Sequence, residues 1–167
     1  MSEKLTSTQK NSILIDMNHR QNYIRLLIMF VFHFIAMYIF MYAMVNTFGN
    51  IYSNYNQFYM AALMAAPMVI IELFIMSSMY PKKKLNLGII TIGIVVLVCS
   101  FFFIREQIAI DDNQFLRSMI PHHAGAILMC EKARLNDPQI QELCKNIISG
   151  QQSEINWMKE KLNKITQ

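Results

Sequence analysis

The sequence predicts an all-α membrane protein in which three transmembrane helices precede an antiparallel helical hairpin outside the membrane. Two observations support this fold class. Hydrophobic residues make up 54% of the 167 positions, and they gather in three long runs within the first two thirds of the chain. An ordinary soluble domain has a lower apolar content. The last third instead places apolar residues at helical spacing among polar ones, as an amphipathic hairpin requires.

The three apolar runs define the domain organisation. Each is about 20 residues long, enough to cross a hydrocarbon core of roughly 30 Å. The first run begins too far along the chain for a cleaved signal peptide, so we expect the N-terminal segment to be retained. The runs cover residues 23–45, 58–80 and 85–104. We therefore predict a polar tail at 1–22, a three-span region at 23–104 and an outer domain at 105–167.

Basic residues predict the orientation of the spans. The tail and its edge carry Lys4, Lys10, Arg20 and Arg25, and the loop after the second run is Pro81-Lys82-Lys83-Lys84. Residues 46–57 contain no Lys or Arg. Because basic loops stay in the cytoplasm, the tail and the lysine loop face inward. The outer domain then lies in the periplasm or outside the cell, and we expect a bacterial inner-membrane protein. The net charge of +4 reflects this topology, and no nucleic-acid surface is evident.

Residues 112–164 read as two helices joined by a short turn. Asp112 or Asn113 can cap a first helix that starts near residue 114 and ends near residue 135. Pro121 predicts a local kink or a later start. Asp137 is a capping residue, and Pro138 suits the first position of a second helix that ends near residue 164. Two helices bury too little surface to be stable alone. We expect a homodimeric four-helix bundle or support from the membrane surface.

Candidate metal ligands lie on both helices of this hairpin. Met119, His122 and His123 are spaced i, i+3 and i+4, and Met129 follows His122 by seven. Gln151, Glu154 and Met158 share one face of the second helix, and folding near residue 137 brings the two polar faces together. Any one of these residues alone more often packs or caps a helix. Together they offer imidazole, thioether and carboxylate donors, which suit a soft or borderline metal such as copper.

Two cysteines are placed symmetrically about the same turn. Cys130 and Cys144 should face one another from opposite helices. In an oxidising compartment a disulfide there would add about 2–4 kcal/mol of stability. The alternatives are a thiolate pair for Cu(I) and two buried reduced cysteines. Cys99 lies in the third span, where simple packing explains it.

The spacing of these residues resembles the domain of unknown function 305 family. The pattern runs from Asp112-x-x-Phe115 through Met119-Ile-Pro-His122-His123 and Ala126-Ile-x-Met129 to Ile148-x-x-Gln151-x-x-Glu154-x-x-x-Met158. The resemblance covers the last third of the chain. It implies a ferritin-like helical bundle, export from the cytoplasm, and copper binding linked to copper tolerance.

By that resemblance the metal site is formed by a set of six residues with two supporting ones. The six are Met119, His122, His123, Met129, Glu154 and Met158, and the two are Gln151 and Asp112. Cys130 and Cys144 depart from the family pattern, in which small residues such as alanine are common there. This departure strengthens the disulfide interpretation and leaves open a stronger Cu(I) site.

Methionine stripes in the first two spans allow a second interpretation. In the first span His33, Met37, Met41 and Met44 recur at helical spacing; in the second, Met60, Met64, Met68, Glu72 and Met76 recur every fourth residue. Such stripes could carry Cu(I) through a membrane, although methionine is also a common packing residue. Glu72 is costly within a span unless it is neutralised, paired or wet. His33 is the other ionisable group well inside a span, and partial proximity of the two stays open.

The sequence therefore predicts a membrane-anchored copper-binding protein that buffers, senses or hands over copper in homeostasis or tolerance. Cu(I) is favoured over Cu(II), and zinc is an alternative. We expect the bilayer and a second copy of the chain as partners. We predict no enzymatic activity, because the sequence shows no nucleophile-base arrangement, phosphate loop or nucleotide motif. A Cu(I) transporter or channel subunit, and a dimerisation module without metal, are the alternative functions.

Overall fold

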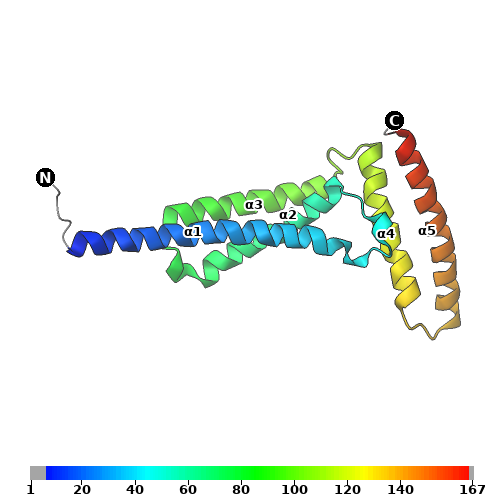
Figure 1. The fold of residues 1–167 in the computed structure, drawn as a ribbon, viewed down its shortest axis with the longest axis horizontal. Coiled ribbons are helices and arrows are strands. Elements are labelled where there is room, and N and C mark those ends of the chain that lie inside the picture. The colour runs from blue at the N-terminus through cyan, green and yellow to red at the C-terminus, as the bar shows by residue number, and fades with distance from the viewer. Residues whose placement is uncertain (1–6, 166–167) are drawn as a thin grey trace.

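The computed structural model describes residues 7–165, with side chains from residue 17 onward. Within that range it contains five α-helices and no strand, so the all-α prediction is confirmed. Three helices form an elongated unit, and the last two lie across one end of it (Figure 1). Three helices are long and apolar enough to cross a membrane, at Met17–Met44, Tyr55–Ile75 and Lys83–Arg105.

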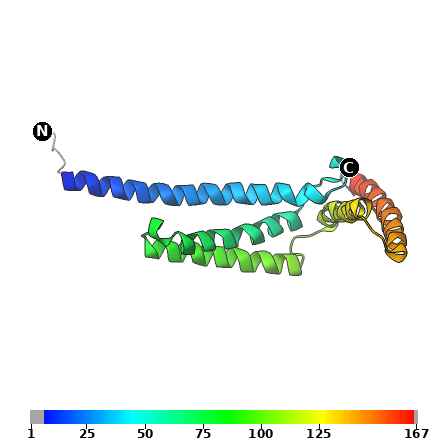
Figure 2. The same ribbon diagram turned by 90° about the horizontal axis from the view of Figure 1, so that it is seen from below.

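Helix α1, Ser7–Phe40, begins well before the first apolar run and continues into a 3-10 turn at Met41–Met44. The predicted polar tail at 1–22 is thus helical from Ser7 onward. Lys4 lies outside the described residues, as does the side chain of Lys10. The N-terminal turns of α1 extend beyond the other two helices of the unit (Figure 2).

Helices α2, Tyr55–Ile75, and α3, Lys83–Arg105, follow as an antiparallel pair. Helix α2 starts earlier than its apolar run because the Asn54 side chain accepts a hydrogen bond from the Gln57 N–H at 2.9 Å. It also ends earlier, at Ile75, although the run continues to residue 80. The side-chain amide of Asn22 donates to the Met79 carbonyl at 3.1 Å, and that of Asn86 donates to the Tyr80 carbonyl at 2.7 Å. These bonds hold residues 76–80 in a turn.

Small residues let α2 and α3 approach closely. Ala61, Ala65 and Ala66 are buried on α2. On α3, a Cβ added to Gly93 would lie 3.2 Å from the Ile70 Cγ1 atom. Helices in lipid gain little from burying apolar surface, so close backbone approach through small residues drives their association.

Helices α4, Asp112–Lys132, and α5, Pro138–Ile165, run antiparallel as an α4–α5 hairpin. Asp111 caps α4, accepting from the Gln114 N–H at 2.8 Å, so the prediction that Asp112 or Asn113 is the cap was wrong. The helix starts two residues earlier than expected, which moves its cap to the preceding acid. Asp137 caps α5 as predicted, accepting from the N–H groups of Gln139 and Ile140. Pro121 lies within α4 without ending it.

The hairpin core is built from large aliphatic side chains of both helices and extends into the three-helix unit. Its buried members are Leu116, Ile120, Ala124, Ile127, Ile155, Met158 and Leu162. Val45 and Tyr52, from the loop between α1 and α2, pack against them. The three-helix unit therefore supplies part of the burial that two helices lack on their own.

Helix α4 is the docking element of the hairpin. A Cβ added to Gly125 would lie 3.5 Å from the Met44 carbonyl oxygen, in ordinary van der Waals contact, so α4 passes close to the end of the 3-10 turn. The Tyr55 N–H donates to the Gln114 side-chain oxygen at 3.0 Å, and the Asn56 and Gln107 side chains exchange hydrogen bonds at 3.0 and 3.1 Å. In both views α5 lies on the far side of α4 from the three-helix unit (Figures 1 and 2).

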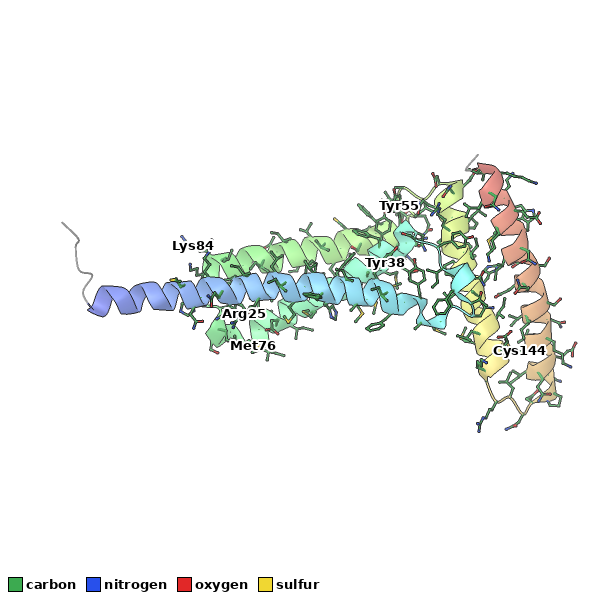
Figure 3. All side chains as sticks on the ribbon, in the orientation of Figure 1. Arg25, Tyr38, Tyr55, Met76, Lys84 and Cys144 are labelled. Atoms are coloured by element: carbon green, nitrogen blue, oxygen red, sulfur yellow. A yellow bond between two sulfur atoms is a disulfide. The ribbon has the colours of Figure 1, made fainter. Side chains whose placement is uncertain are left out.

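The two ends of the three-helix unit differ in character. Arg25, Met76 and Lys84 lie near one end, and Tyr38 and Tyr55 lie near the other, beside the hairpin (Figure 3). We call these the basic end, defined by Arg25 and Lys82–Lys84, and the hairpin end. The lysine loop and the hairpin are therefore separated by the full length of the spans.

Candidate metal site

The seam between α4 and α5 brings one predicted imidazole to one predicted carboxylate. His123 Nδ1 lies 3.0 Å from Glu154 Oε2. The imidazole is largely buried, whereas the Glu154 side chain is mostly exposed. The approach does not follow a hydrogen-bond direction, so the buried Nδ1 atom has no hydrogen-bond partner. The contact thus brings a ring nitrogen close to a carboxylate oxygen at the rim of the hairpin, and it is an ion pair only when the imidazole is protonated.

Gln151 adds a second unsatisfied atom to this seam. Its side-chain oxygen is buried without a hydrogen-bond partner, one helical turn before Glu154. Buried polar atoms in native proteins are paired in the great majority of cases. Two orphaned acceptor-capable atoms on one seam are therefore a reason to consider a bound cation.

The two methionines predicted at this seam occupy different environments. Met119 is partly buried and lies one turn before His123 on α4, packed against the edge of the hairpin core. Met158 is inside that core, with 5% of its surface exposed. Met119 therefore lies at the edge of the hairpin core, whereas Met158 packs inside it. We call His123, Glu154, Gln151 and Met119 the inner group.

His122 and Met129 lie elsewhere on α4. Both are exposed, Met129 by 53%. They are seven residues apart and so share a side of the helix, about 100° away from that of His123. The two imidazole centroids are 6.0 Å apart, with ring planes at 57°. We call His122 and Met129 the outer pair, because the structure does not bring them to Glu154.

Asp112 is distant from both groups. It is exposed in the first turn of α4, eleven positions before His123, which is about 16 Å along the helix axis. Its carboxylate suits the positive end of the helix dipole. The structure therefore gives Asp112 a place at the helix start and no contact with the inner group.

Cys130 and Cys144 are joined as a disulfide that links α4 to α5, with Cα atoms 5.2 Å apart. Figure 3 shows Cys144 on α5 near the turn of the hairpin. The bond lies two turns beyond His123 and ties the two walls of the seam together. Disulfide sulfurs are not thiolates, so in this form they add no ligand. Cys99 is free and exposed on α3.

The inner group is a small donor set. Among residues 17–165, no group of three or more His, Cys, Asp or Glu side chains comes together. One chain offers one imidazole and one carboxylate in contact at the seam, with the Met119 thioether one helical turn before His123 and the Gln151 amide one turn before Glu154. This combination suits a soft or borderline ion better than a hard one.

Comparison with protein families identifies the hairpin. Residues 106–162 match the family described as Domain of unknown function (DUF305). The family resemblance predicted from the sequence is thereby confirmed. An uncharacterized protein of Acanthamoeba polyphaga mimivirus is 42% identical over 93 residues, which are 54% of this chain and 59% of that protein. The chain thus spans less than two thirds of that relative. No solved structure matches the chain significantly.

Outside the DUF305 hairpin, Glu72 has a partner that the sequence did not suggest. The Tyr80 hydroxyl donates to Glu72 Oε1 at 3.4 Å. Burial, followed by the charge and hydrogen bond of Glu72, raises the pKa of Tyr80 above its ordinary value, so the hydroxyl keeps its proton. Glu72 lies in the last turn of α2, near the basic end. The position of Tyr80, just after α2, could have suggested this contact, because a tyrosine hydroxyl there can reach a carboxylate in the last turn of the helix.

The residues of the predicted membrane path lie at different depths in the three-helix unit. Met64 is exposed on α2, and Met68 packs against the cluster of Leu26, Val69 and Leu73. His33 and Met37 on α1 and Met41 in the 3-10 turn that follows are partly buried. Two cavities lie between the spans, and no methionine lines either of them.

Proposed function

We propose that this protein is a membrane-anchored copper-binding protein whose hairpin holds copper at the inner group. Its role would be buffering, sensing or handing over the metal in copper homeostasis or tolerance. The 3.0 Å approach of His123 Nδ1 to Glu154 Oε2 carries the proposal, because it places an imidazole nitrogen and a carboxylate oxygen within reach of one ion. The orphaned Gln151 oxygen and the Met119 thioether on the same seam support it.

The chemistry of the donors favours Cu(I) over Cu(II), with zinc as the alternative. A thioether is a soft ligand, and imidazole accepts copper and zinc alike. Copper is here the cargo of the protein. We propose binding rather than catalysis, because these side chains supply ligands and include no Ser, Thr or Cys nucleophile.

A second copy of the chain would complete the donor set. One inner group has few donors, and the outer pair of His122 and Met129 is exposed on an adjacent side of α4. Phe115 and Trp157 are exposed large apolar side chains on α4 and α5. Pairing of two hairpins would cover such side chains in a four-helix bundle and add ligands to each site.

We further propose that the basic end is cytoplasmic and the hairpin lies in the periplasm or outside a bacterial cell. Arg25 and Lys82–Lys84 lie at the end away from the hairpin, which supports this orientation under the positive-inside rule. The disulfide supports it as well, because such bonds persist in oxidising compartments.

Competition titration of the detergent-solubilised full chain with Cu(I) and Zn(II) tests the proposal. We expect His123→Ala to lower copper affinity by about tenfold or more, in the range seen when groups supporting a metal site are lost. His33→Ala is the matched control, because it removes an imidazole from α1 and should leave the affinity unchanged. Unchanged affinity in a folded His123→Ala variant would overturn the proposal.

A further inference from the structure

An apolar groove lies between α1, α2 and α3 toward the basic end. Its volume is about 220 Å³, and all three helices contribute to its walls. Leu26 and Phe30 come from α1, Val69 comes from α2, and Ile92 and Gly93 come from α3. Gly93 packs against Ile70 of α2 and contributes no side chain to the groove wall.

The groove lies between helices that are long and apolar enough to span a membrane, so in the proposed membrane-anchored state it would border the hydrocarbon region. Ile92 and Leu27 stand at its edge and are 66% and 63% exposed, and both lie within candidate spans. Side chains around an empty groove lose dispersion contacts on one side. In a bilayer the surrounding molecules of matching shape and polarity are lipid acyl chains. The groove therefore fits one such chain.

Tyr23 connects the groove to the lysine loop. Its ring lines the groove, and its hydroxyl accepts a hydrogen bond from the Lys82 N–H at 3.1 Å. The same hydroxyl donates to Asn86 Oδ1 at 2.7 Å, which fixes the ring at this boundary. A lipid whose chain occupies the groove thus has its headgroup at the level of Lys82–Lys84.

The charge at this boundary is almost entirely positive. Arg25, Lys83 and Lys84 are exposed there, and Figure 3 shows Arg25 and Lys84 at the same end of the unit. Glu72 is the sole acidic residue between positions 17 and 105, and it accepts a hydrogen bond from Tyr80. Basic pockets between transmembrane helices bind anionic headgroups.

We propose that this groove and the basic end form a binding site for an anionic phospholipid. The groove holds one acyl chain, and Lys83 and Lys84 bind the phosphate headgroup. This site uses the opposite end of the molecule from the inner group and is independent of copper binding.

Native mass spectrometry of the detergent-solubilised full chain tests the headgroup half of the site. With equal phosphatidylglycerol and phosphatidylcholine added, we expect preferential retention of phosphatidylglycerol. Lys83→Gln with Lys84→Gln should lower the ratio of the two lipids about fivefold per lysine removed. Lys161→Gln with Lys164→Gln removes the same charge from α5 and should leave the ratio unchanged. Equal retention of both lipids by the wild type would overturn the proposal.

Filling the groove tests the acyl-chain half. Ile92→Trp places a larger ring at the edge of the groove and should reduce retention of phosphatidylglycerol several-fold. Ile94→Trp is the matched control, because Ile94 is 49% exposed on the same helix and does not line the groove. If Ile92→Trp fails to fold, Leu27→Trp fills the same groove from α1. Wild-type retention in the folded groove variants, or displacement of the lipid by soluble glycerophosphate, would overturn the proposal.

Discussion

The hairpin and the three-helix unit place their large apolar side chains differently: the hairpin buries them in its core, whereas α2 of the three-helix unit buries mainly small residues. In the hairpin, large aliphatic side chains such as Ile120, Ile127 and Ile155 are fully buried. In the three-helix unit the buried residues of α2 are mainly small, and Met64 and Phe74 are exposed. Lipid is as apolar as a leucine side chain, so an outward methionine loses little there. Methionine at a polar seam such as that of Met119 is therefore more informative than a methionine stripe in a span.

The largest effect of this difference should appear in alanine substitutions of isoleucines. Ile120→Ala removes a fully buried side chain from the hairpin core and should lower the free energy of unfolding by about 2–5 kcal/mol. Ile71→Ala, at an exposed position of α2, should change it by less than about 0.5 kcal/mol. Denaturant unfolding followed by Trp157, the single tryptophan, reports on the hairpin directly. Equal losses for both variants would remove the distinction between the two regions.

The disulfide distinguishes the hairpin from the three-helix unit, because it lowers the entropy of the unfolded hairpin chain and so stabilises the folded hairpin. Cys130→Ser with Cys144→Ser opens a loop with a sequence separation of 14 and should cost about 2–4 kcal/mol of hairpin stability. The Cys99→Ser variant serves as the control, since Cys99 is free and exposed on α3. The same Trp157 unfolding curve, measured with and without reductant, checks both. No shift in the double variant would mean that the bond does not support the hairpin.

Methionine substitutions separate the two regions by metal affinity. Met119→Leu keeps the apolar volume but removes a soft donor, so we expect copper affinity to fall several-fold. Met64→Leu with Met68→Leu should leave both copper affinity and copper flux into liposomes unchanged. Loss of copper flux in the Met64→Leu, Met68→Leu variant, together with unchanged copper affinity in Met119→Leu, would instead support the transporter interpretation.

The smallest expected effect concerns the pairing of Glu72. Tyr80→Phe removes the hydroxyl that donates to this carboxylate while keeping the buried ring. We expect a loss of about 1 kcal/mol, the usual net contribution of one hydrogen bond. Thermal unfolding of the full chain followed by circular dichroism measures it. A loss as large as that for Ile120→Ala would show that the basic end depends on this pair more than the geometry implies.

Much of the fold follows from local sequence patterns, because helix caps and apolar periods act over a few residues. The Asp137-Pro138 pair marks the start of α5 clearly. At α4, three consecutive polar residues can each serve as a cap, and the backbone conformation selects Asp111. The early end of α2 could not be predicted from hydropathy, since the turn is held by a bond from Asn22, 57 positions from Met79, and by a bond from Asn86 on the next helix.

The sequence suggests which residues to consider as ligands, but it does not give their arrangement in space. Neighbouring residues on a helix point about 100° apart, so His122 and His123 cannot both face α5. Which of them does depends on how α4 packs against both α5 and the loop that contains Val45 and Tyr52. That packing is a tertiary property, and it places His123 rather than His122 beside Glu154.

X-ray absorption at the copper edge tests the central claim most directly. Full-length protein loaded with Cu(I) should show nitrogen or oxygen neighbours together with sulfur, and the imidazole contribution should weaken in His123→Ala. A shell of sulfur alone, unchanged in His123→Ala, would contradict the account and place the copper on the methionines of the spans.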